Sequence, residues 1–485
     1  MKHSILSFLT FFLLVVFSAC NPARKSISDS VEIVEKPNIL FIFADDLGKE
    51  WISSYGAEEI ETPRIDDLAR NGLMFENFYA MPQCTPSRVS LFTGQYPFRH
   101  GWVNHWDVPR WGGGAHFDPD TNPSFARILQ SAGYKNAAAG KWQVNDFRVQ
   151  PEIMKEHGFD DYCMWTGYET GNPPSAERYW DPYIHTKSGS KTYHGQFGED
   201  VFVDFLIDFM GKNKNGPIFL YYSMCLPHTP LTTTPAEPVV SGNIERHKAM
   251  VRYIDILVGR LEDALVELGL RENTIIIFAT DNGSTIGITG LRNGREVKGG
   301  KQKTTENGIC VPFIVNCPGM IPEGKVTNAL SDITDIFPTF VELANAEVPD
   351  NIGIDGVSQA KVFTGATKDS QRDWIMAMGG GNNAALSKKG VENQYRFRDR
   401  VIRDKKYKLF VSSERKPEKL VNLKADPEEK NNLLPANTAD TRKALRKLWK
   451  VDETFPEKDN DPIYNPLPPE SWDVDITVES EVWKK

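Results

Sequence analysis

The chain has 485 residues, a formal net charge of −9 at pH 7 and 40% hydrophobic residues. A chain of this length can bury a large core and divide into about two or three domains. The acidic balance argues against a nucleic acid partner, because binding a phosphate backbone needs a basic surface. An acidic protein also cannot attract an anionic substrate through its overall field. Any positive potential must be local, built from a metal ion and a few cationic side chains.

The N-terminus has the pattern of an export signal. Basic residues precede an apolar run over 5–17, which is too short to span a bilayer comfortably. The run ends in Phe-Ser-Ala-Cys, which resembles a bacterial lipobox with Cys20 as the lipidated residue; cleavage by an ordinary signal peptidase is the alternative. We expect a signal peptide at 1–20 and a polar tether at 21–36. The expected location is therefore a lipid anchor, in the periplasm or on the outer-membrane surface of a Gram-negative bacterium.

Apolar strands and amphipathic helices alternate after the tether. Residues 38–44 form a continuous apolar run, as expected of a strand that is buried on both faces. A Thr-Pro pair at 62–63 opens a helix. Further strands are expected at 136–139, 218–224 and 274–280, and a long amphipathic helix at about 244–268. This alternation predicts an α/β fold with a large, mainly parallel sheet flanked by helices.

Polar side chains follow four of these predicted strands. The strand ends read Asp45-Asp46, Gly140-Lys141, Pro227-His228 and Asp281-Asn282. Ligands of open α/β sheets bind beyond the carboxyl ends of the strands, so we expect these side chains to converge. One acidic pair often caps a helix, but four polar ends are hard to explain as capping or turn chemistry alone. The acids and the asparagine offer hard oxygen ligands, which suit calcium or magnesium better than zinc or copper.

A cysteine motif lies where another helix should begin. Residues 84–88 read Cys-Thr-Pro-Ser-Arg and precede a short apolar run that ends in Thr-Gly. Taken alone, the motif also fits a turn with Pro86 at the first helical position. It resembles the Cys-x-Pro-x-Arg signature of the type I sulfatases, which belong to the alkaline-phosphatase-like superfamily. In that family the cysteine becomes formylglycine, an aldehyde whose hydrate is the nucleophile.

The resemblance covers nearly the whole mature chain and implies a metal site. Asp45 and Asp46 match the paired acids of the family, while Asp281 and Asn282 match its Asp-Asn-Gly motif. Together with Cys84, these residues are the ligands that the resemblance implies for one Ca²⁺ per chain.

The resemblance also implies roles for four cationic or titratable residues. Arg88 matches the arginine that stabilises the formylglycine hydrate, and Lys141 matches a lysine that contacts sulfate and the nucleophile. His228, in Pro-His-x-Pro, matches the histidine next to the leaving oxygen. Lys301 matches the second sulfate-binding lysine. The helix start at 86–88 would add backbone N–H groups for an oxyanion.

One position departs from the family pattern. Gln143 stands where the family has Gly-Lys-Trp-His. That histidine is given the role of binding the hydrate and helping to expel sulfate by taking a proton. Glutamine can donate and accept hydrogen bonds, but its side chain does not titrate near neutral pH. Either another base acts in release, or turnover is slow, or the site only binds; we favour altered turnover because the nucleophile and the metal ligands remain.

The implied reaction is hydrolysis of a sulfate ester by a sulfuric ester hydrolase. A hydrate oxygen at position 84 would attack sulfur in line with the leaving alcohol, and the nearby cations would stabilise the oxygens as charge moves. The implied partners are a sulfated carbohydrate and a maturase, either a formylglycine-generating enzyme or an anaerobic one. The alternatives are a phosphodiesterase or phosphonate hydrolase of the same superfamily, and a non-catalytic glycan-binding lipoprotein.

Two loops carry aromatic and basic residues that suit a carbohydrate. Aromatic faces stack on sugar rings, while arginine and histidine can bind carboxylate or sulfate groups. The candidate substrate-binding residues are His105, Arg110, His116, Arg178 and His185. Together with bacterial export, they favour a sulfated polysaccharide such as ulvan, carrageenan, fucoidan or a glycosaminoglycan over a small aryl sulfate.

The C-terminal part has a different character. We expect the catalytic domain at 37–383 and a smaller α+β subdomain at 384–485, with an antiparallel sheet, a helix and an irregular tail. Its expected elements are strands at 400–402 and 407–411 and a helix at about 438–450. The other cysteines, Cys163, Cys225, Cys310 and Cys317, have no CxxC spacing. Cys310 and Cys317 could form a disulfide, but free buried thiols are equally compatible with the sequence.

Overall fold

The structure is a computed structural model, which describes residues 36–103, 117–148, 150–165, 167, 172–379, 384–387, 390–393 and 397–460. The predicted signal peptide, Cys20 and nearly all of the predicted tether lie outside these ranges. Within them, no helix combines the length and the hydropathy needed to cross a membrane.

A mixed sheet of 10 strands organises the chain. In spatial order its strands are β13 (Lys325–Thr327), β2 (Leu73–Phe75), β12 (Phe313–Asn316), β9 (Thr274–Thr280), β1 (Asn38–Ala44), β8 (Ile218–Ser223), β4 (Lys135–Lys141), β5 (Asp161–Trp165), β6 (Tyr183–Thr186) and β7 (Gly189–Thr192). The central strands from β9 to β5 are mutually parallel. Antiparallel pairing begins on either side of them, at β12 and at β6, so the predicted parallel strands form the centre of a mixed sheet.

The packing of β1 explains why its sequence is apolar from Ile39 to Ala44. Side chains alternate between the two faces of a strand. Ile39, Phe41 and Phe43 join the apolar core on one face of the sheet, and Leu40, Ile42 and Ala44 join the core on the other. All seven residues of β1 are buried, as the unbroken apolar run at 38–44 predicts.

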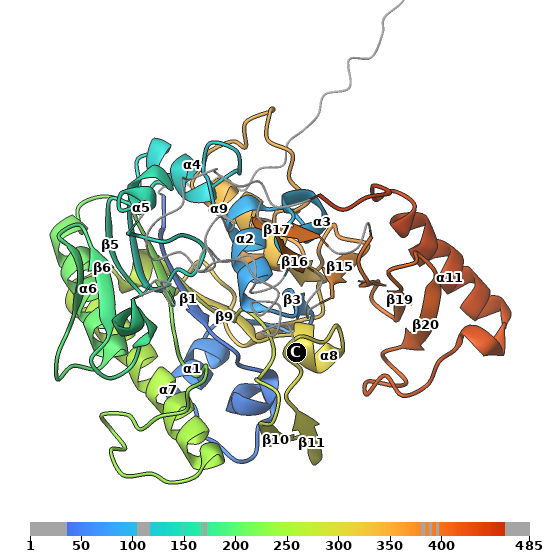
Figure 1. Cartoon of the computed structure of the whole chain (residues 1–485), viewed down its shortest axis with the longest axis horizontal. Coiled ribbons are helices and arrows are strands. Elements are labelled where there is room, and N and C mark those ends of the chain that lie inside the picture. The colour runs from blue at the N-terminus through green and yellow to red at the C-terminus, as the bar shows by residue number, and fades with distance from the viewer. Residues whose placement is uncertain are drawn as a thin grey trace, which may run out of the picture. The chain divides into compact units, whose positions relative to one another are not determined.

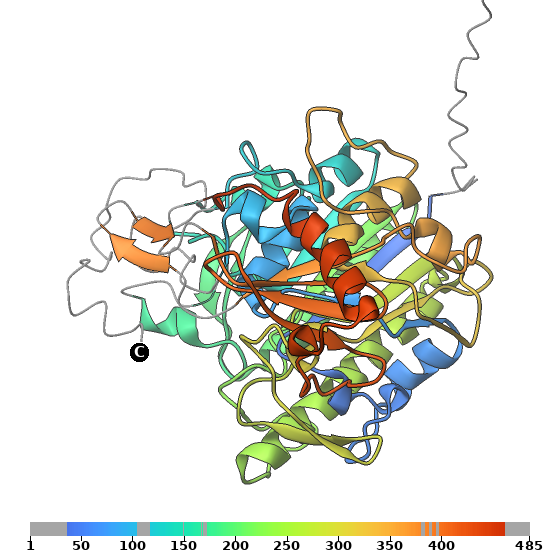
Figure 2. The same cartoon turned by 90° about the vertical axis from the view of Figure 1, so that its right-hand side faces the viewer.

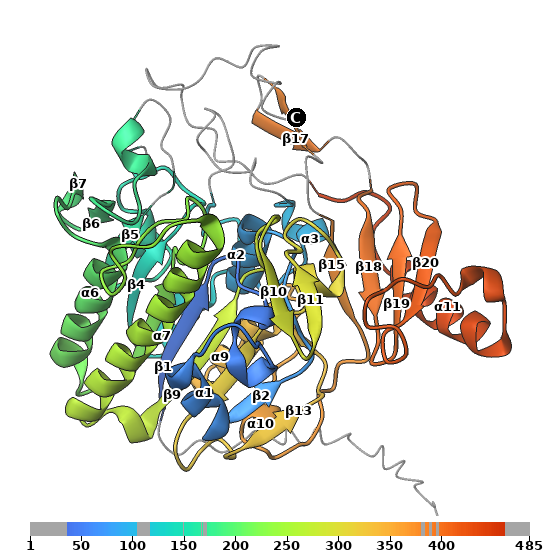
Figure 3. The same cartoon turned by 90° about the horizontal axis from the view of Figure 1, so that it is seen from below.

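Helices cover both faces of this sheet (Figure 1). One core contains residues of α1 (Pro63–Arg70), α6 (Gly198–Asn213) and α7 (Asn243–Glu267). The opposite core contains residues of α2 (Cys84–Thr93), α4 (Phe125–Ser131) and α9 (Ile336–Leu343). Figure 3 shows α6 and α7 lying side by side along the sheet. The long helix predicted at about 244–268 is α7. It ends at Glu267, and Gly269, two residues later, has a left-handed backbone conformation with a φ of 72°.

A separate antiparallel sheet forms the C-terminal subdomain. Its order is β15 (Ile375–Met378), β18 (Arg400–Arg403), β19 (Tyr407–Val411) and β20 (Pro417–Asn422). Helix α11 (Ala439–Asp452) packs across this sheet (Figure 2). Lys408 of β19, which is fully buried, lies 3.0 Å from a carboxylate oxygen of Glu306 and 2.7 Å from one of Glu429. The pair with Glu306 joins the subdomain to the predicted catalytic domain, and the pair with Glu429 lies within the subdomain.

Shorter elements complete the described chain. The paired strands are β3 (Phe78–Tyr79) with β14 (Ser331–Asp332), β10 (Thr289–Arg292) with β11 (Arg295–Lys298), and β16 (Ala384–Ser387) with β17 (Gly390–Asn393). The short α-helices are α3 (Pro97–His100), α5 (Ile153–Glu156), α8 (Glu306–Ile309) and α10 (Ala360–Phe363). The 3₁₀ turns are η1 (Lys49–Trp51), η2 (Ser53–Tyr55), η5 (Pro173–Ala176), η6 (Arg271–Asn273), η7 (Ile333–Asp335) and η8 (Leu434–Ala436).

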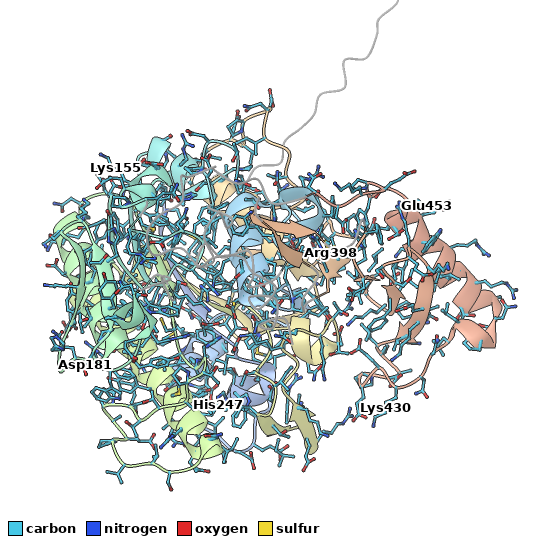
Figure 4. All side chains as sticks on the ribbon, viewed as in Figure 1. Lys155, Asp181, His247, Arg398, Lys430 and Glu453 are labelled. Carbon is cyan, nitrogen blue, oxygen red and sulfur yellow. The ribbon has the colours of Figure 1, made fainter. Side chains whose placement is uncertain are left out.

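Charged side chains lie mainly at the periphery. Figure 4 shows Lys155, Asp181, Lys430 and Glu453 at the outer edges of the molecule, and all four are exposed. Each of the described cysteines is a free thiol, so the possible disulfide between Cys310 and Cys317 does not form. These two residues are instead held in place separately, with Cys310 accepting a hydrogen bond from Lys49 at 3.1 Å.

Candidate active site

Four parallel strands and one helix bring the predicted residues together. Asp45 and Asp46 follow β1, Asp281 and Asn282 follow β9, and the other two strand ends are those of β4 and β8. The carboxyl ends of neighbouring parallel strands meet at one edge of the sheet, which is where ligands bind in such folds. Cys84 begins α2, so the helix starts within the cysteine motif, two residues before the start expected at 86–88. The structure thus brings these segments together at one edge of the sheet.

The acidic residues form one buried cluster with the cysteine. Ligand atoms of Asp45, Cys84 and Asp281 all lie within 4.8 Å of one another, as do those of Asp45, Asp46 and His228. The backbone N–H of Asp46 donates to a carboxylate oxygen of Asp281 at 3.0 Å. The side-chain amide of Asn282 donates to Asp46 at 2.7 Å. Three carboxylates thus share a small volume from which most water is excluded.

Three cations neutralise this cluster. Lys141 donates to Asp45 at 2.6 Å, Lys301 donates to Asp46 at 2.7 Å, and Arg88 donates to Asp281 at 2.8 Å. Arg88 is 2% exposed and its second amino group donates to Ser223 of β8, so the helix and the sheet hold the guanidinium from two sides. The positive charge that the acidic chain lacks overall is concentrated here.

The pKa values of the carboxyl groups follow from these contacts. Burial opposes ionisation of Asp45, but the charges of Lys141, His228 and Arg88 outweigh it and lower its pKa below the ordinary value. Burial likewise opposes ionisation of Asp46, and Lys301 outweighs it, so that its pKa is also lowered. Asp281 differs: burial, followed by the charge of Asp45, raises its pKa to about 7. Three carboxylates therefore do not all ionise easily in this cluster without an added cation.

The donor atoms fit a hard divalent cation. Oδ1 of Asp45 and Oδ1 of Asn282 are buried and have no hydrogen-bond partner among the described residues. Buried polar atoms are normally hydrogen-bonded. Within the described part of the chain, the Asp45 oxygen has only Arg88 Nη2 at 3.9 Å as an ion-pair partner, so both oxygens are available to a cation. An all-oxygen set of this kind suits Ca²⁺ or Mg²⁺.

His228 lies at the edge of the cluster. Its side chain is 20% exposed, and Nε2 lies 3.6 Å from a carboxylate oxygen of Asp46. Burial, followed by the charge of Lys301, lowers the pKa of His228 to about 3. The ring is therefore neutral at neutral pH in this structure and meets the cluster through Nε2.

The turn that carries His228 is held by residues that the sequence did not single out. Glu199, at the first turn of α6, accepts hydrogen bonds from the backbone N–H groups of Cys225 and Leu226 at 2.7 and 3.1 Å and from the hydroxyl of Tyr222 at 2.6 Å. Glu199 is fully buried, and burial raises its pKa to about 7. Its only sequence signal is an acid in the first turn of an amphipathic helix, which is also common without such a role.

Gln143 occupies a strained position next to the site. It follows Lys141 by two residues and has a φ of 72°, in the left-handed region that side chains other than glycine seldom adopt. Its Oε1 is buried without a hydrogen-bond partner among the described residues. Strained backbone and unsatisfied polar atoms often mark functional positions.

The predicted substrate residues are only partly described. His105, Arg110 and His116 lie outside the described residues. Arg178 lies beside the site, with Nη1 3.1 Å from Nδ1 of His228. His185 is buried, with one ring nitrogen 2.8 Å from Ser190 and the other 2.9 Å from the carbonyl oxygen of Pro151. Both nitrogens of His185 serve the fold, which corrects the expectation that this ring faces a substrate.

Comparisons with known proteins agree with the motif. Residues 37–346 match the protein-family model described as Sulfatase, and residues 300–453 match the model described as N-sulphoglucosamine sulphohydrolase, C-terminal. The chain is 31% identical to N-acetylgalactosamine-6-sulfatase of Canis lupus familiaris over 359 residues, which covers 68% of this chain and 66% of that protein. It therefore spans just under two thirds of that relative. It is 32% identical to arylsulfatase A of Bos taurus, with 68% of each chain covered.

A solved structure has the same fold over most of its length. Ps i-CgsB is 26% identical, with a TM-score of 0.73, and the match covers 89% of this chain and 95% of that one. The same protein in complex with k-i-k-neocarrahexaose matches at 25% identity with a TM-score of 0.72.

Proposed function

The chain belongs to the sulfatase family, and on that basis we propose that it hydrolyses sulfate esters. The observation that carries the proposal is the convergence of Cys84 and Arg88 with two lysines and a buried oxygen cluster at one edge of the sheet. That set supplies a nucleophile position, anion-binding charge and metal ligands within one small volume.

The nucleophile is expected at position 84. Cys84 lies at the first residue of α2 and is 3% exposed, so a small group there would face the cluster rather than bulk water. The motif supports conversion of Cys84 to formylglycine by a maturase, and the hydrated aldehyde would then supply an oxygen nucleophile for sulfur. The N-terminus of α2 favours negative charge at the same point.

One divalent cation would be held by Asp45, Asp46, Asp281 and Asn282. The resemblance to the family implies that this cation is Ca²⁺. Position 84 would complete this set. A bound ion would supply positive charge that helps to gather the sulfate oxygens and the nucleophile. The buried oxygens of Asp45 and Asn282 support this assignment, because neither accepts a hydrogen bond among the described residues.

Cationic side chains of the protein would bind the sulfate group. Lys141 and Lys301 already point at the cluster and are positioned to take sulfate oxygens as well as carboxylates. Arg88 holds the Asp281 carboxylate in place. Charge that develops on the sulfate oxygens would be stabilised by groups that need no rearrangement.

His228 would act on the leaving oxygen. Its Nε2 faces the cluster and part of the ring is open to an incoming molecule. The neutral ring would stabilise negative charge on the leaving oxygen by a hydrogen bond from Nε2, which matters most for sugar esters because an alkoxide is a poor leaving group. Gln143 would bind the reacting group by hydrogen bonds without exchanging a proton, so release of sulfate would depend on another base and would differ from that of relatives with histidine.

We propose a sulfated polysaccharide or oligosaccharide as substrate. Two matches support a carbohydrate: an N-acetylgalactosamine-6-sulfatase among the relatives, and a solved structure whose title names a complex with k-i-k-neocarrahexaose. The proposed location, a lipid anchor at Cys20 facing the periplasm or the outside of the cell, fits a protein that meets such polymers. It rests on the lipobox-like segment alone.

The test is a screen for released sulfate. Purified protein with matured Cys84 would be offered defined sulfated oligosaccharides, an aryl sulfate and matched phosphate esters. We expect sulfate release from at least one glycan and little release of phosphate. Faster cleavage of phosphate esters would favour the phosphodiesterase alternative, and rapid turnover of the aryl sulfate without any glycan activity would overturn the glycan assignment.

A further inference from the structure

The imidazole of His228 has two neighbours at the same ring nitrogen. Nδ1 lies 3.1 Å from Nη1 of Arg178 and 2.6 Å from the carbonyl oxygen of Thr229. The two contacts make opposite demands on that nitrogen. A guanidinium only donates, so Arg178 requires a bare Nδ1, whereas a carbonyl only accepts, so Thr229 requires a hydrogen on Nδ1.

A neutral imidazole carries one hydrogen, so the choice at Nδ1 decides what Nε2 can do. With Nδ1 bare, the hydrogen is on Nε2, which is the nitrogen that faces Asp46 at 3.6 Å and the cluster beyond it. With the hydrogen on Nδ1, Nε2 becomes an acceptor and cannot donate to a leaving oxygen.

Arg178 is held where it can impose the first arrangement. Its guanidinium lies 4.0 Å from the ring centre of Trp165, at the end of β5, as a cation–π contact. The indole N–H of Trp165 donates to the carbonyl oxygen of Ser175 at 2.8 Å, which fixes the ring under the guanidinium. The planar arginine group is thereby oriented before any ligand arrives.

The adjacent residue fixes the backbone of the same turn. The hydroxyl of Tyr179 lies 2.6 Å from the carbonyl oxygen of Cys225 and 2.5 Å from that of His228. Arg178 and Tyr179 thus hold the ring and the backbone of His228 from one short segment. Two consecutive residues aimed at the same turn argue that the contact at Nδ1 is built into the fold.

We propose that Arg178 is a positioning residue that holds His228 in the tautomer with its hydrogen on Nε2. Without Arg178, the hydrogen moves to Nδ1, where it is donated to the carbonyl oxygen of Thr229. Nε2 then changes from a hydrogen-bond donor to an acceptor at the site. The substrate-binding role that the sequence indicates for Arg178 is then secondary. The functional part of this inference rests on the proposed sulfate ester hydrolysis, but the tautomer itself does not.

The tautomer can be read without turnover. Protein labelled with ¹⁵N at histidine would be compared as wild type, Arg178→Met and Arg178→Lys, with His228 assigned by its loss in His228→Gln. We expect a bare Nδ1 and a protonated Nε2 in the wild type, the reverse in Arg178→Met, and the wild-type pattern in Arg178→Lys. Arg252→Met is the control, because Arg252 pairs with Glu237 instead. The same tautomer in wild type and Arg178→Met, or a protonated Nδ1 in the wild type, would overturn the inference.

Kinetics separate positioning from substrate binding. Loss of a hydrogen-bond donor to a developing oxyanion typically slows a reaction by about 10²–10³-fold, and good leaving groups are affected far less because they need less stabilisation. Arg178→Met should therefore reduce kcat on a sugar sulfate by roughly tenfold or more while sparing an activated aryl sulfate, and should add no further loss in a His228→Gln background. A raised KM on both substrates that persists in that background would show direct substrate binding and contradict the positioning role. If the wild type cleaves neither substrate, the proposed function fails while the NMR result still decides the tautomer.

Discussion

Replacing Glu199 by glutamine should make the protein more stable than the wild type at pH 8 and leave it about equally stable at pH 5. Glu199 is fully buried and accepts hydrogen bonds from two backbone N–H groups and from Tyr222. Both N–H groups bond Oε1, which glutamine retains, and the hydroxyl of Tyr222 can accept from the new amide. The substitution therefore removes an ionisable group without removing the contacts that hold the His228 turn.

The magnitude follows from the pKa of Glu199. Burial raises that pKa from 4.5 to about 7, so the unfolded chain loses its proton at lower pH than the folded protein. The contribution of Glu199 to stability is therefore fully present below pH 4.5 and is lost as the pH rises through 7. One pKa unit corresponds to about 1.4 kcal/mol, so the free energy of unfolding should shift by about 3 kcal/mol in favour of glutamine between pH 5 and pH 8.

Denaturant unfolding of both proteins at pH 5 and pH 8 measures this shift. Glu199→Ala is the contrasting variant, because it leaves buried N–H groups unpaired at about 1–3 kcal/mol each and should be destabilised at both pH values. A stability difference between glutamine and glutamate that does not change with pH would refute the reasoning. So would an alanine variant as stable as the wild type.

Three further predictions concern the site itself. Asp45→Ala and Asp281→Ala should abolish turnover while circular dichroism shows an intact fold; stoichiometric zinc with no calcium in the wild type would contradict the oxygen-ligand assignment. Because the pKa of Asp281 is raised to about 7, Ca²⁺ binding to metal-free protein should release more protons at pH 6 than at pH 8, as calorimetry in buffers of different ionisation enthalpy would detect. Gln143→Ala should cost less rate than Cys84→Ala or His228→Ala, and accumulation of sulfated enzyme in the wild type would show instead that sulfate release is crippled.

The central sheet could be predicted because its strands carry strong local signals. β1 and β9 have the predicted bounds, 38–44 and 274–280, because continuous apolar runs end there in ionisable residues. The same feature located the site, since polar residues at the ends of parallel strands meet at one edge. Strand β7 at the sheet edge could not be predicted, because it reads Gly-Ser-Lys-Thr and buries no apolar side chain.

Contacts between distant segments could not be predicted from local pattern. Glu199 and Arg178 both reach the His228 turn from segments tens of residues away. The neighbourhood of Glu199 does not distinguish it from a surface charge, and that of Arg178 indicated a substrate contact rather than a contact with His228. His185 looked like a loop histidine in a polar cluster, but it lies on β6 between the rings of Phe147 and Tyr162. In each case the tertiary fold, rather than the local sequence, decides the role of a polar side chain.

The most direct test of the central claim is the chemical state of residue 84 in active protein. Peptide mass spectrometry of protein made in a host with a formylglycine-generating maturase should find the aldehyde or its hydrate at position 84, and sulfate-releasing activity should rise with the modified fraction. An unmodified cysteine in protein that cleaves sulfate esters, or a fully modified residue in protein that cleaves none, would contradict the account.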